Sequence, residues 1–391
     1  MFKKVLLFLF LCKISDGVEF SDLRYFGERV RNMSVEMFYF TQLENEGDLV
    51  MAPFSLWNLI SVVAFKSSSD TWRQLHSIIG ISKRNGQYFN SIFKFTTDVM
   101  TNVSLFPGVS FKNAQLVLFD ENLELTQSFQ RSVIESGISL KMVDFEDDVT
   151  AAAEANHYYQ KQTNNTFSPE LLIFDRTDFE ESTMIVSGMV EFEGNWTIPF
   201  NKSDTMLENG TGIYIMQQKA NVKQVDIEIL GASVLELNYG QNEEFNMVVL
   251  TPHEGVSIKD VLINFDKISF TDLLSKLHSE PLKEVDVKLP KFSVTSTLLL
   301  NGPLTTMEAR DIFLPSQADF SGITEEEVFI SSIEHRAMIT VSETGTRATA
   351  FTPGNLSKGK KTSTTDSVSS FLFFIVYRPS YTILFCGKYG A

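Results

Sequence analysis

The segment from Ile330 to Pro353 constrains the fold most strongly, because a strand pattern passes directly into a tract of small residues. Its first part is rich in β-branched residues and alternates apolar with polar positions, which predicts a strand. At Gly345 small residues take over, and a polar, basic stretch continues to Ser370 without a helix or strand pattern. The apolar run Phe371–Tyr377 then predicts another strand. A chain in this order can lengthen its first strand by inserting the loop that follows.

Composition and charge limit the classes of protein to which the chain can belong. With 391 residues, of which 43% are hydrophobic, it can bury a large core in one domain or two. The formal net charge of -16 argues against nucleic acids, polyanions and anionic membranes as partners.

Residues 1–17 have the composition of a secretory signal peptide. Lys3 and Lys4 precede the apolar run Val5–Cys12, and small residues follow at 15–17. The apolar run is too short to cross a bilayer, and no later stretch of about 18 apolar residues occurs. We therefore expect a soluble, secreted chain that begins at residue 18.

Seven N-x-S/T sequons agree with a secretory route. Six of them are candidate N-glycosylation sites: Asn32, Asn102, Asn164, Asn201, Asn209 and Asn355. The seventh, Asn195, precedes a Trp at a predicted strand end and is the doubtful one.

Cys386 is the only cysteine that remains once the signal is removed, so no intramolecular disulfide can form. It lies in an apolar strand pattern, which favours a buried, inert thiol over a reactive thiol or a dimer bridge. The stability of the mature chain must therefore come from its core.

Helical patterns dominate the first half of the chain, and strand patterns dominate the second. Helices are predicted at Phe20–Glu44, Leu56–Lys66 with Ser55 as a possible N-cap, Asp70–Ile79, Gln87–Asn102, Ser128–Ser136 and Thr150–Gln162. Strands are predicted at Gln115–Phe119, Met184–Trp196, Ser233–Tyr239, Phe245–Thr251, Val285–Val294, Glu327–Glu343 and the C-terminus. This order, without regular βαβ alternation, indicates an α+β fold.

The sequence shows no constellation for catalysis or metal binding. The five His residues lack metal-ligand spacing, and neither H-E-x-x-H nor C-x-x-C occurs. A G-x-S-x-G elbow, a P-loop and a dinucleotide fingerprint are also absent. Acidic clusters such as Asp144–Asp148 fit solvated faces better than paired-carboxylate catalysis. We therefore predict that the protein is not an enzyme and uses neither a metal nor another cofactor.

Several short blocks carry a more specific signal. They are Phe192–Phe200 (FEGNWTIPF), Leu235–Tyr239 (LELNY), Leu289–Phe292 (LPKF), Ala318–Ile323 (ADFSGI), Ile330–Glu343 (ISSIEHRAMITVSE), Phe371–Ile375 (FLFFI) and Ile383–Lys388 (ILFCGK). Any one block alone would be a weak signal. In this order along the chain, they resemble the serpin family of serine protease inhibitors.

The resemblance implies a fold and a mechanism. The fold is a single domain over residues 18–391, with about eight or nine helices around three β-sheets and an exposed reactive-centre loop at about 345–370. In the mechanism, a target protease cleaves the loop and becomes acylated, and the loop then inserts as a new strand of the largest sheet. The intact protein would be metastable, and the expected form is a monomer that meets an extracellular serine protease.

Insertion requires small side chains at alternate positions, because a central strand buries every second residue. The resemblance places the hinge of the loop at Glu343, Gly345, Thr346, Ala348 and Ala350. The face that continues to Thr352 is uniformly small. Pro353 opposes insertion beyond that point because proline cannot donate a ladder hydrogen bond. Thr344 stands where inhibitory members usually carry an acidic residue.

The resemblance also indicates where the sheet must open. Ser55, His335 and Trp196 match residues of that region in the family. Ala52 and Gly188, however, stand where family members commonly have a serine and an asparagine near the buried histidine. A buried His without these partners must find others or destabilise the fold.

Counting from Gly345 as in the family, the resemblance places the scissile bond near Gly359–Lys360, in a basic tip that comprises Lys358, Gly359, Lys360 and Lys361. A trypsin-like protease cuts after Lys or Arg, so Lys358 or Lys360 is the expected bait. The alternative is a solvated basic tip without this role. A glycan on Asn355 could block approach of the protease.

Taken together, these patterns favour a secreted inhibitor of a trypsin-like serine protease that works by loop cleavage and insertion. The alternative is a non-inhibitory member of the family, whose loop is a plain substrate and which acts as a binding or carrier protein. The alternation of small residues favours the first, as does the loop, because the 26 steps from Gly345 to Phe371 are the length that the resemblance implies for an inhibitory member. Pro353, Thr344, Ala52 and Gly188 favour the second.

Overall fold

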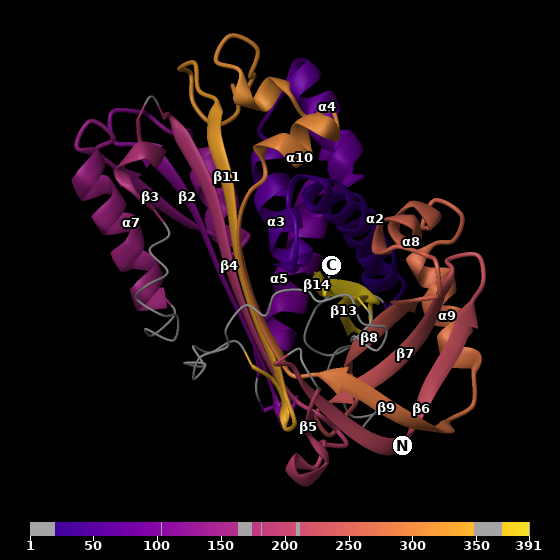
Figure 1. The fold of residues 1–391 in the computed structure, drawn as a ribbon. Coiled ribbons are helices and arrows are strands. Elements are labelled where there is room, and N and C mark those ends of the chain that lie inside the picture. Colours follow the sequence, from indigo (N-terminus) through magenta and orange to yellow (C-terminus); the bar gives the residue numbers. More distant parts are fainter. Residues whose placement is uncertain are drawn as a thin grey trace.

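The structure is a computed structural model that describes residues 20–102, 104–162, 174–180, 182–208, 212–347 and 370–390. In these ranges, nine α-helices and four 3-10 helices surround two continuous β-sheets (Figure 1). The α-helices are α2 (Phe20–Glu44), α3 (Pro53–Ala64), α4 (Ser69–Ile79), α5 (Gly86–Thr101), α6 (Gln127–Glu135), α7 (Asp148–Gln162), α8 (Ile258–Asn264), α9 (Phe270–Ser279) and α10 (Asn301–Thr306). The 3-10 helices are η1 (Lys83–Asn85), η2 (Arg176–Asp178), η3 (Lys202–Asp204) and η4 (Asp311–Phe313).

One sheet has six strands, in the order β10–β11–β12–β4–β2–β3. Its strands are β2 (Val109–Asp120), β3 (Ser139–Val143), β4 (Met184–Asn195), β10 (Phe292–Leu299), β11 (Ile330–Ser342) and β12 (Gly345–Arg347). In Figure 1, α7 covers one face of this sheet and α3 lies on the other. β4 is therefore buried along most of its length, whereas buried and exposed side chains alternate along the edge strand β10.

The second sheet has eight strands, in the order β1–β14–β13–β8–β7–β6–β5 with β9 also paired to β6. They are β1 (Leu49–Met51), β5 (Met206–Leu207), β6 (Tyr214–Ile227), β7 (Ala232–Tyr239), β8 (Phe245–Pro252), β9 (Lys283–Pro290), β13 (Phe371–Tyr377) and β14 (Thr382–Tyr389). The sheet divides within β6, because its first part pairs with β5 and β9 and its last five residues pair with β7. The two halves and the six-stranded sheet are the three sheets that the resemblance implied, so the predicted fold class is confirmed.

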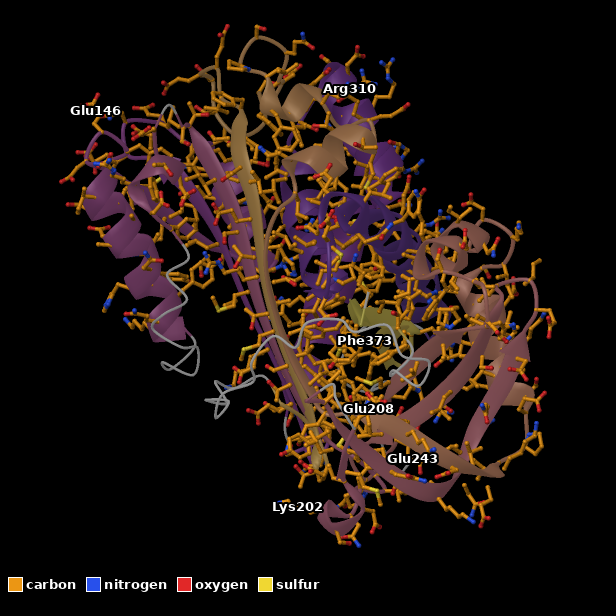
Figure 2. All side chains as sticks on the ribbon, viewed as in Figure 1. Glu146, Lys202, Glu208, Glu243, Arg310 and Phe373 are labelled. Atoms are coloured by element: carbon orange, nitrogen blue, oxygen red, sulfur yellow. The ribbon has the colours of Figure 1, made fainter. Side chains whose placement is uncertain are left out.

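Aromatic and aliphatic side chains of α2 and α3 form the centre of the core. Every residue of α3 is buried, and the ring of Trp57 meets Phe26 of α2 edge-on, with ring centroids 5.2 Å apart. Figure 2 shows Phe373 inside the molecule and the charged Glu146 and Arg310 at its periphery. Cys386 is also fully buried, as predicted, and burial raises the pKa of its thiol.

The start of α3 differs from the prediction. The helix begins at Pro53, because the fixed φ of proline suits a first helical position, and Ala52 is the N-cap. Ser55 is therefore not an N-cap and lies inside the helix, where its side chain can point toward the six-stranded sheet.

The described residues contain neither a membrane-spanning helix nor a cluster of metal-ligating side chains. None of their helices is long and apolar enough to cross a bilayer. Nor do their His, Cys, Asp and Glu side chains gather in groups that could hold a metal ion.

Candidate functional site at the β4–β11 junction

The loop that follows β11 enters the six-stranded sheet. After a turn at Glu343 and Thr344, β12 runs antiparallel to β11 and also pairs with β4. Thr346 lies between the two strands, opposite Val341 on one side and Gly194 on the other. Nearer the start of β11, β11 and β4 pair directly with each other in parallel. At its end near β5, the sheet is therefore already opened by the first three residues of the loop (Figure 1).

Thr346 points into the core. Its side chain is buried, and its hydroxyl lies 2.6 Å from the hydroxyl of Tyr239 on β7. Burial raises the pKa of Tyr239, so this phenol stays neutral and can donate to or accept from the threonine. Thr346 is thus the one residue of the predicted small face that lies within the described residues, and its side chain is buried.

Gly345 is required by the close approach of β12 to β4. Its φ of +152° is rarely adopted by residues with a side chain, and an added Cβ would lie 2.1 Å from the carbonyl oxygen of Gly194. Only a glycine allows the chain to enter the sheet at this point.

Trp196 holds the turn between β11 and β12. Its indole N–H donates to the carbonyl of Ser342 at 2.9 Å, and its backbone N–H donates to the carbonyl of Thr344 at 3.0 Å. Its ring stacks on Tyr239, with centroids 4.4 Å apart. The tryptophan therefore contacts both the turn and Tyr239, whose hydroxyl forms the hydrogen bond with Thr346.

Glu343 anchors the other side of the turn. Its carboxylate lies 3.2 Å from the ammonium of Lys291 and accepts a hydrogen bond from Thr205 at 3.2 Å. Burial by itself raises the pKa of Glu343, but its own backbone N–H, Lys291 and Thr205 outweigh burial, and the net pKa is below its ordinary value.

A chain of amide and hydroxyl groups joins α3 to β2 beneath the junction. The Ser55 hydroxyl donates to Asn113 at 2.9 Å and accepts from the Gln115 amide at 2.9 Å. The Gln115 amide also donates to the Ser55 carbonyl at 2.6 Å, and its oxygen accepts from Asn58 at 2.6 Å. These bonds satisfy polar groups that are otherwise buried between a helix and a sheet.

His335 lies on β11, opposite Gly188 of β4, and is fully buried. Its Nε2 accepts the backbone N–H of Ala52 at 2.8 Å, which fixes the proton of the neutral ring on Nδ1. Burial lowers the pKa of His335 to about 3, and the Gly188 backbone offsets this only in part. The backbone N–H of Ala52, the N-cap of α3, is thus one hydrogen-bond partner of His335, although position 52 lacks the serine side chain that the resemblance led us to expect.

Gly188 leaves the other side of His335 without a side-chain partner. The Nδ1 atom makes no hydrogen bond of normal geometry within the described residues. A Cβ at Gly188 would lie 3.9 Å from Nδ1 and 3.2 Å from the Ser55 hydroxyl, but only 2.9 Å from a methyl of Leu59. A larger residue at Gly188 would need Leu59 to move, which explains in packing terms why glycine is accommodated here.

The other predicted site residues either lie on the exposed surface or fall outside the residues that the structure describes. Ala348, Ala350, the tip residues Lys358, Gly359, Lys360 and Lys361, and the sequons Asn164, Asn209 and Asn355 lie outside the described residues. The side chains of Asn32, Asn102, Asn195 and Asn201 are exposed.

Sequence reasoning missed several residues that complete the site. Asn113 and Gln115 lie in β2 just before its apolar run Leu116–Phe119, and polar residues adjoining a buried run were a signal that could have been followed. Tyr239 and Lys291 fall within the family-like blocks, but nothing in their spacing relates them to Thr346 or Glu343. Their roles depend on contacts between strands far apart in sequence.

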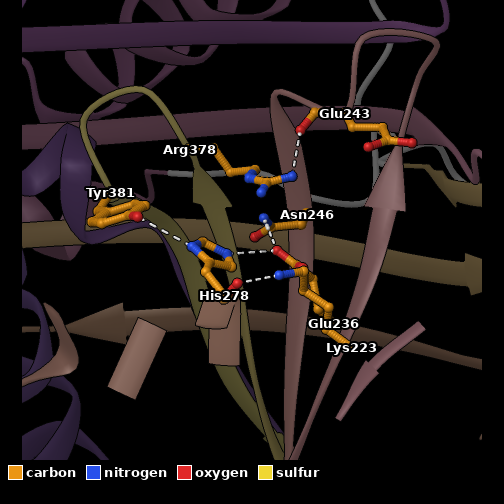
Figure 3. A network of polar contacts seen from close by, with 7 residues as sticks. All are labelled: Lys223, Glu236, Glu243, Asn246, His278, Arg378 and Tyr381. Atoms are coloured by element: carbon orange, nitrogen blue, oxygen red, sulfur yellow. Dashed lines mark hydrogen bonds and ion pairs between the residues drawn. The ribbon is translucent and has the colours of Figure 1, made fainter. Parts of the chain in front are cut away.

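A second polar network lies on the eight-stranded sheet, beneath the end of α9 (Figure 3). The Glu236 carboxylate, only 3% exposed, accepts from Asn246 at 2.7 Å and lies 2.9 Å from Nε2 of His278. The other ring nitrogen of His278 lies 3.1 Å from the Tyr381 hydroxyl. Lys223 donates to the His278 carbonyl as well. The network ties α9 to β7, β8 and the turn before β14.

An α+β fold with a sheet that admits the start of a following loop defines a class of strand-insertion proteins, and comparison with known proteins supplies the family. Residues 28–390 match the family model described as serpin (serine protease inhibitor). The chain therefore belongs to the serpin family. Members of this family are inhibitors of proteases rather than enzymes, and a serine protease is the general class of target.

The similar proteins are distant relatives. Human leukocyte elastase inhibitor is 29% identical over 371 residues, which cover 88% of this chain and 93% of the relative. Human serpin B3 is 24% identical and covers 91% of this chain and 96% of its own length. Among solved structures, Manduca sexta serpin-12 matches with a TM-score of 0.78 at 22% identity, and human thyroxine-binding globulin with 0.74 at 19%. These two matches cover 93% and 94% of this chain, respectively, and 98% of each structure.

Proposed function

We propose that the chain is a secreted inhibitor of a trypsin-like serine protease that acts by loop cleavage and insertion. One observation carries the proposal: β12 already pairs with both β11 and β4, with the small side chain of Thr346 buried between them. A sheet that accepts the first residues of the loop needs only to separate β11 from β4 further along. Lys358 and Lys360 are the residues after which the protease would cut.

A second function is favoured by residues that oppose further separation of β11 from β4 in the six-stranded sheet. Gly188 offers no side chain to His335, and Pro353 cannot donate a hydrogen bond to a neighbouring strand. If these features stop insertion, the protease would deacylate and leave. The protein would then act as a non-inhibitory binding or carrier protein.

Secretion is part of the proposal and has its own support. The signal-like residues 1–17 and the exposed side chains of Asn32, Asn102 and Asn201 are consistent with passage through the secretory pathway. Expression in secreting cells should give a protein that starts at residue 18 and loses mass on treatment with N-glycosidase F. Retention of residues 1–17 in an unglycosylated protein would contradict it.

The inhibitory function is tested by incubating the mature protein with trypsin and separating the products on denaturing gels. We expect a band that contains both proteins and survives denaturant, because the acyl bond to the protease is covalent. Trypsin whose active-site serine has been blocked should give no such band. A Lys358→Ala, Lys360→Ala double variant should lose the complex as well. Cleavage of the loop without a complex, with trypsin fully active, would favour the carrier function instead.

A further inference from the structure

A cleft between α5 and α6 lies apart from the β4–β11 junction, and the sequon residue Asn102 is one of the residues that line it. Its volume is about 1260 Å³, and it opens beside the end of α3. Apolar side chains at its base include Phe65, Phe95 and Val99. Its walls carry hydroxyl, amide and charged groups from α5 and α6. The cleft contains none of the residues that bind β12 or His335.

The charge of the cleft is opposite to that of the protein. Basic residues in its lining outnumber acidic ones, although the whole chain carries a net charge of -16. The basic residues are Lys66, Lys83, Lys94 and Arg131, and the acidic ones are Asp98 and Glu135. Lys94 is neutralised by Asp98 at 2.8 Å. The local positive charge thus comes from the other three cations.

These three cations form no ion pair with a carboxylate of the described residues. Lys66 donates to the Ser128 hydroxyl at 2.7 Å, and Lys83 donates to the Ser67 carbonyl. Burial lowers the pKa of Lys66, Glu135 raises it in part, and the like charge of Lys83 lowers it further. Glu135 thus offsets the burial of Lys66 only in part, and a bound negative charge would stabilise the charged lysine further.

The N-terminal end of α6 adds to this field. Ser128 lies in the first turn of the helix and also lines the cleft. The helix dipole places partial positive charge at that end, on the same wall as Arg131. The lining of the cleft therefore combines cations and a helix N-terminus with apolar side chains.

We propose that the cleft binds a small amphipathic anion, with its acidic head between Lys66 and Arg131 and its apolar body against Phe65, Phe95 and Val99. A neutral apolar ligand would leave the cations without a partner. A long polyanion fits less well, because Asp98 and Glu135 border the cleft and the surrounding protein is acidic. The site is separate from the reactive loop and does not depend on protease inhibition.

Two fluorescent probes with the same aromatic rings test this proposal. 8-Anilinonaphthalene-1-sulfonate carries one negative charge, whereas N-phenyl-1-naphthylamine carries none. We expect saturable binding of the sulfonate to one site on the mature protein, at least about tenfold tighter than binding of the neutral probe, a ratio that corresponds to about 1.4 kcal/mol. Equal affinity for both probes would overturn the role of charge.

Variants locate the site and separate it from adventitious dye binding. Arg131→Gln changes an exposed side chain and should weaken sulfonate binding about tenfold, and the Lys66→Gln, Arg131→Gln double variant should weaken it further. Arg84→Gln removes a neighbouring exposed cation that does not line the cleft and should leave binding unchanged. Unchanged binding in the double variant would contradict the proposal. Displacement of the probe by dextran sulfate at lower concentration than by decanoate would assign the site to polyanions instead.

Discussion

At the scale of single residues, Gly345 is the most sensitive position of the hinge. We expect Gly345→Ala to expel β12, because the added Cβ would overlap the carbonyl of Gly194. Backbone amides of residues 345–347 would then lose their ladder hydrogen bonds and exchange with solvent at least about tenfold faster. Hydrogen–deuterium exchange with mass spectrometry measures this directly.

The matched control is Gly255→Ala. Gly255 also has a positive φ, of +80°, but no atom lies near the position of an added Cβ. This variant carries the same kind of backbone strain without the clash, so the exchange of residues 345–347 should not change. Equal protection in the Gly345→Ala protein and the parent would show that β12 does not pair as described.

His335 makes stability depend on pH, and the sign follows from its lowered pKa. The ring takes up a proton near pH 6.5 when unfolded but only at about pH 3 when buried. Between these values the unfolded chain binds the extra proton, so stability falls as pH falls, by about 1.4 kcal/mol for each pH unit.

A second buried group opposes this slope. Burial, and then the nearby Asp178, raise the pKa of Glu334 to about 8, so that its contribution increases as pH falls from 8 toward its ordinary value of 4.5. The test therefore compares unfolding free energies of the parent and His335→Asn from pH 7 to pH 5. We expect the difference between them to change by about 2 kcal/mol. A difference independent of pH would contradict a neutral, buried His335.

At the scale of elements, the polar network beneath α9 is expected to stabilise the packing of that helix. His278→Ala would remove a partner of the buried Glu236 carboxylate and should cost about 1 to 3 kcal/mol. His253→Ala is the control, because His253 lies 3.7 Å from the exposed Asp226 and should matter by less than about 0.5 kcal/mol. Equal shifts of the urea midpoint in both variants would refute this role.

Elements with one strong periodic pattern were predictable from the sequence. α2 begins and ends where its apolar spacing predicts, and β4 and β7 agree to within one residue. The predicted strand Val285–Val294 was wrong, because β9 ends at Pro290 and β10 begins at Phe292 in a different sheet. A run of alternating residues contains no sign of which sheet each half joins.

Other elements were missed because tertiary contacts define them. β6 carries many polar residues, since its first part is only partly buried, and it gave no clear strand pattern. β12 consists of three residues whose strand character comes from the two neighbours on either side. Such an element exists only once the sheet around it has formed.

At the scale of the whole molecule, the sequence predicted the family and fold more completely than the site. The family-like blocks sufficed to predict the fold because they occur along the chain in the same order as in the family that they resemble. They could not predict that the backbone N–H of Ala52 would donate a hydrogen bond to His335, since a backbone donor is present at nearly every position. Nor could they predict the hydrogen bond between Tyr239 and Thr346, because that contact joins two different sheets.

The central claim is that the six-stranded sheet accepts the loop as a further strand. The most direct measurement is the melting temperature of the mature protein before and after trypsin cuts the loop in the region Lys358–Lys361. We predict a rise of tens of degrees in the cut protein, because a new central strand adds ladder hydrogen bonds and buries one face of small side chains. An unchanged melting temperature after complete cleavage would contradict the claim.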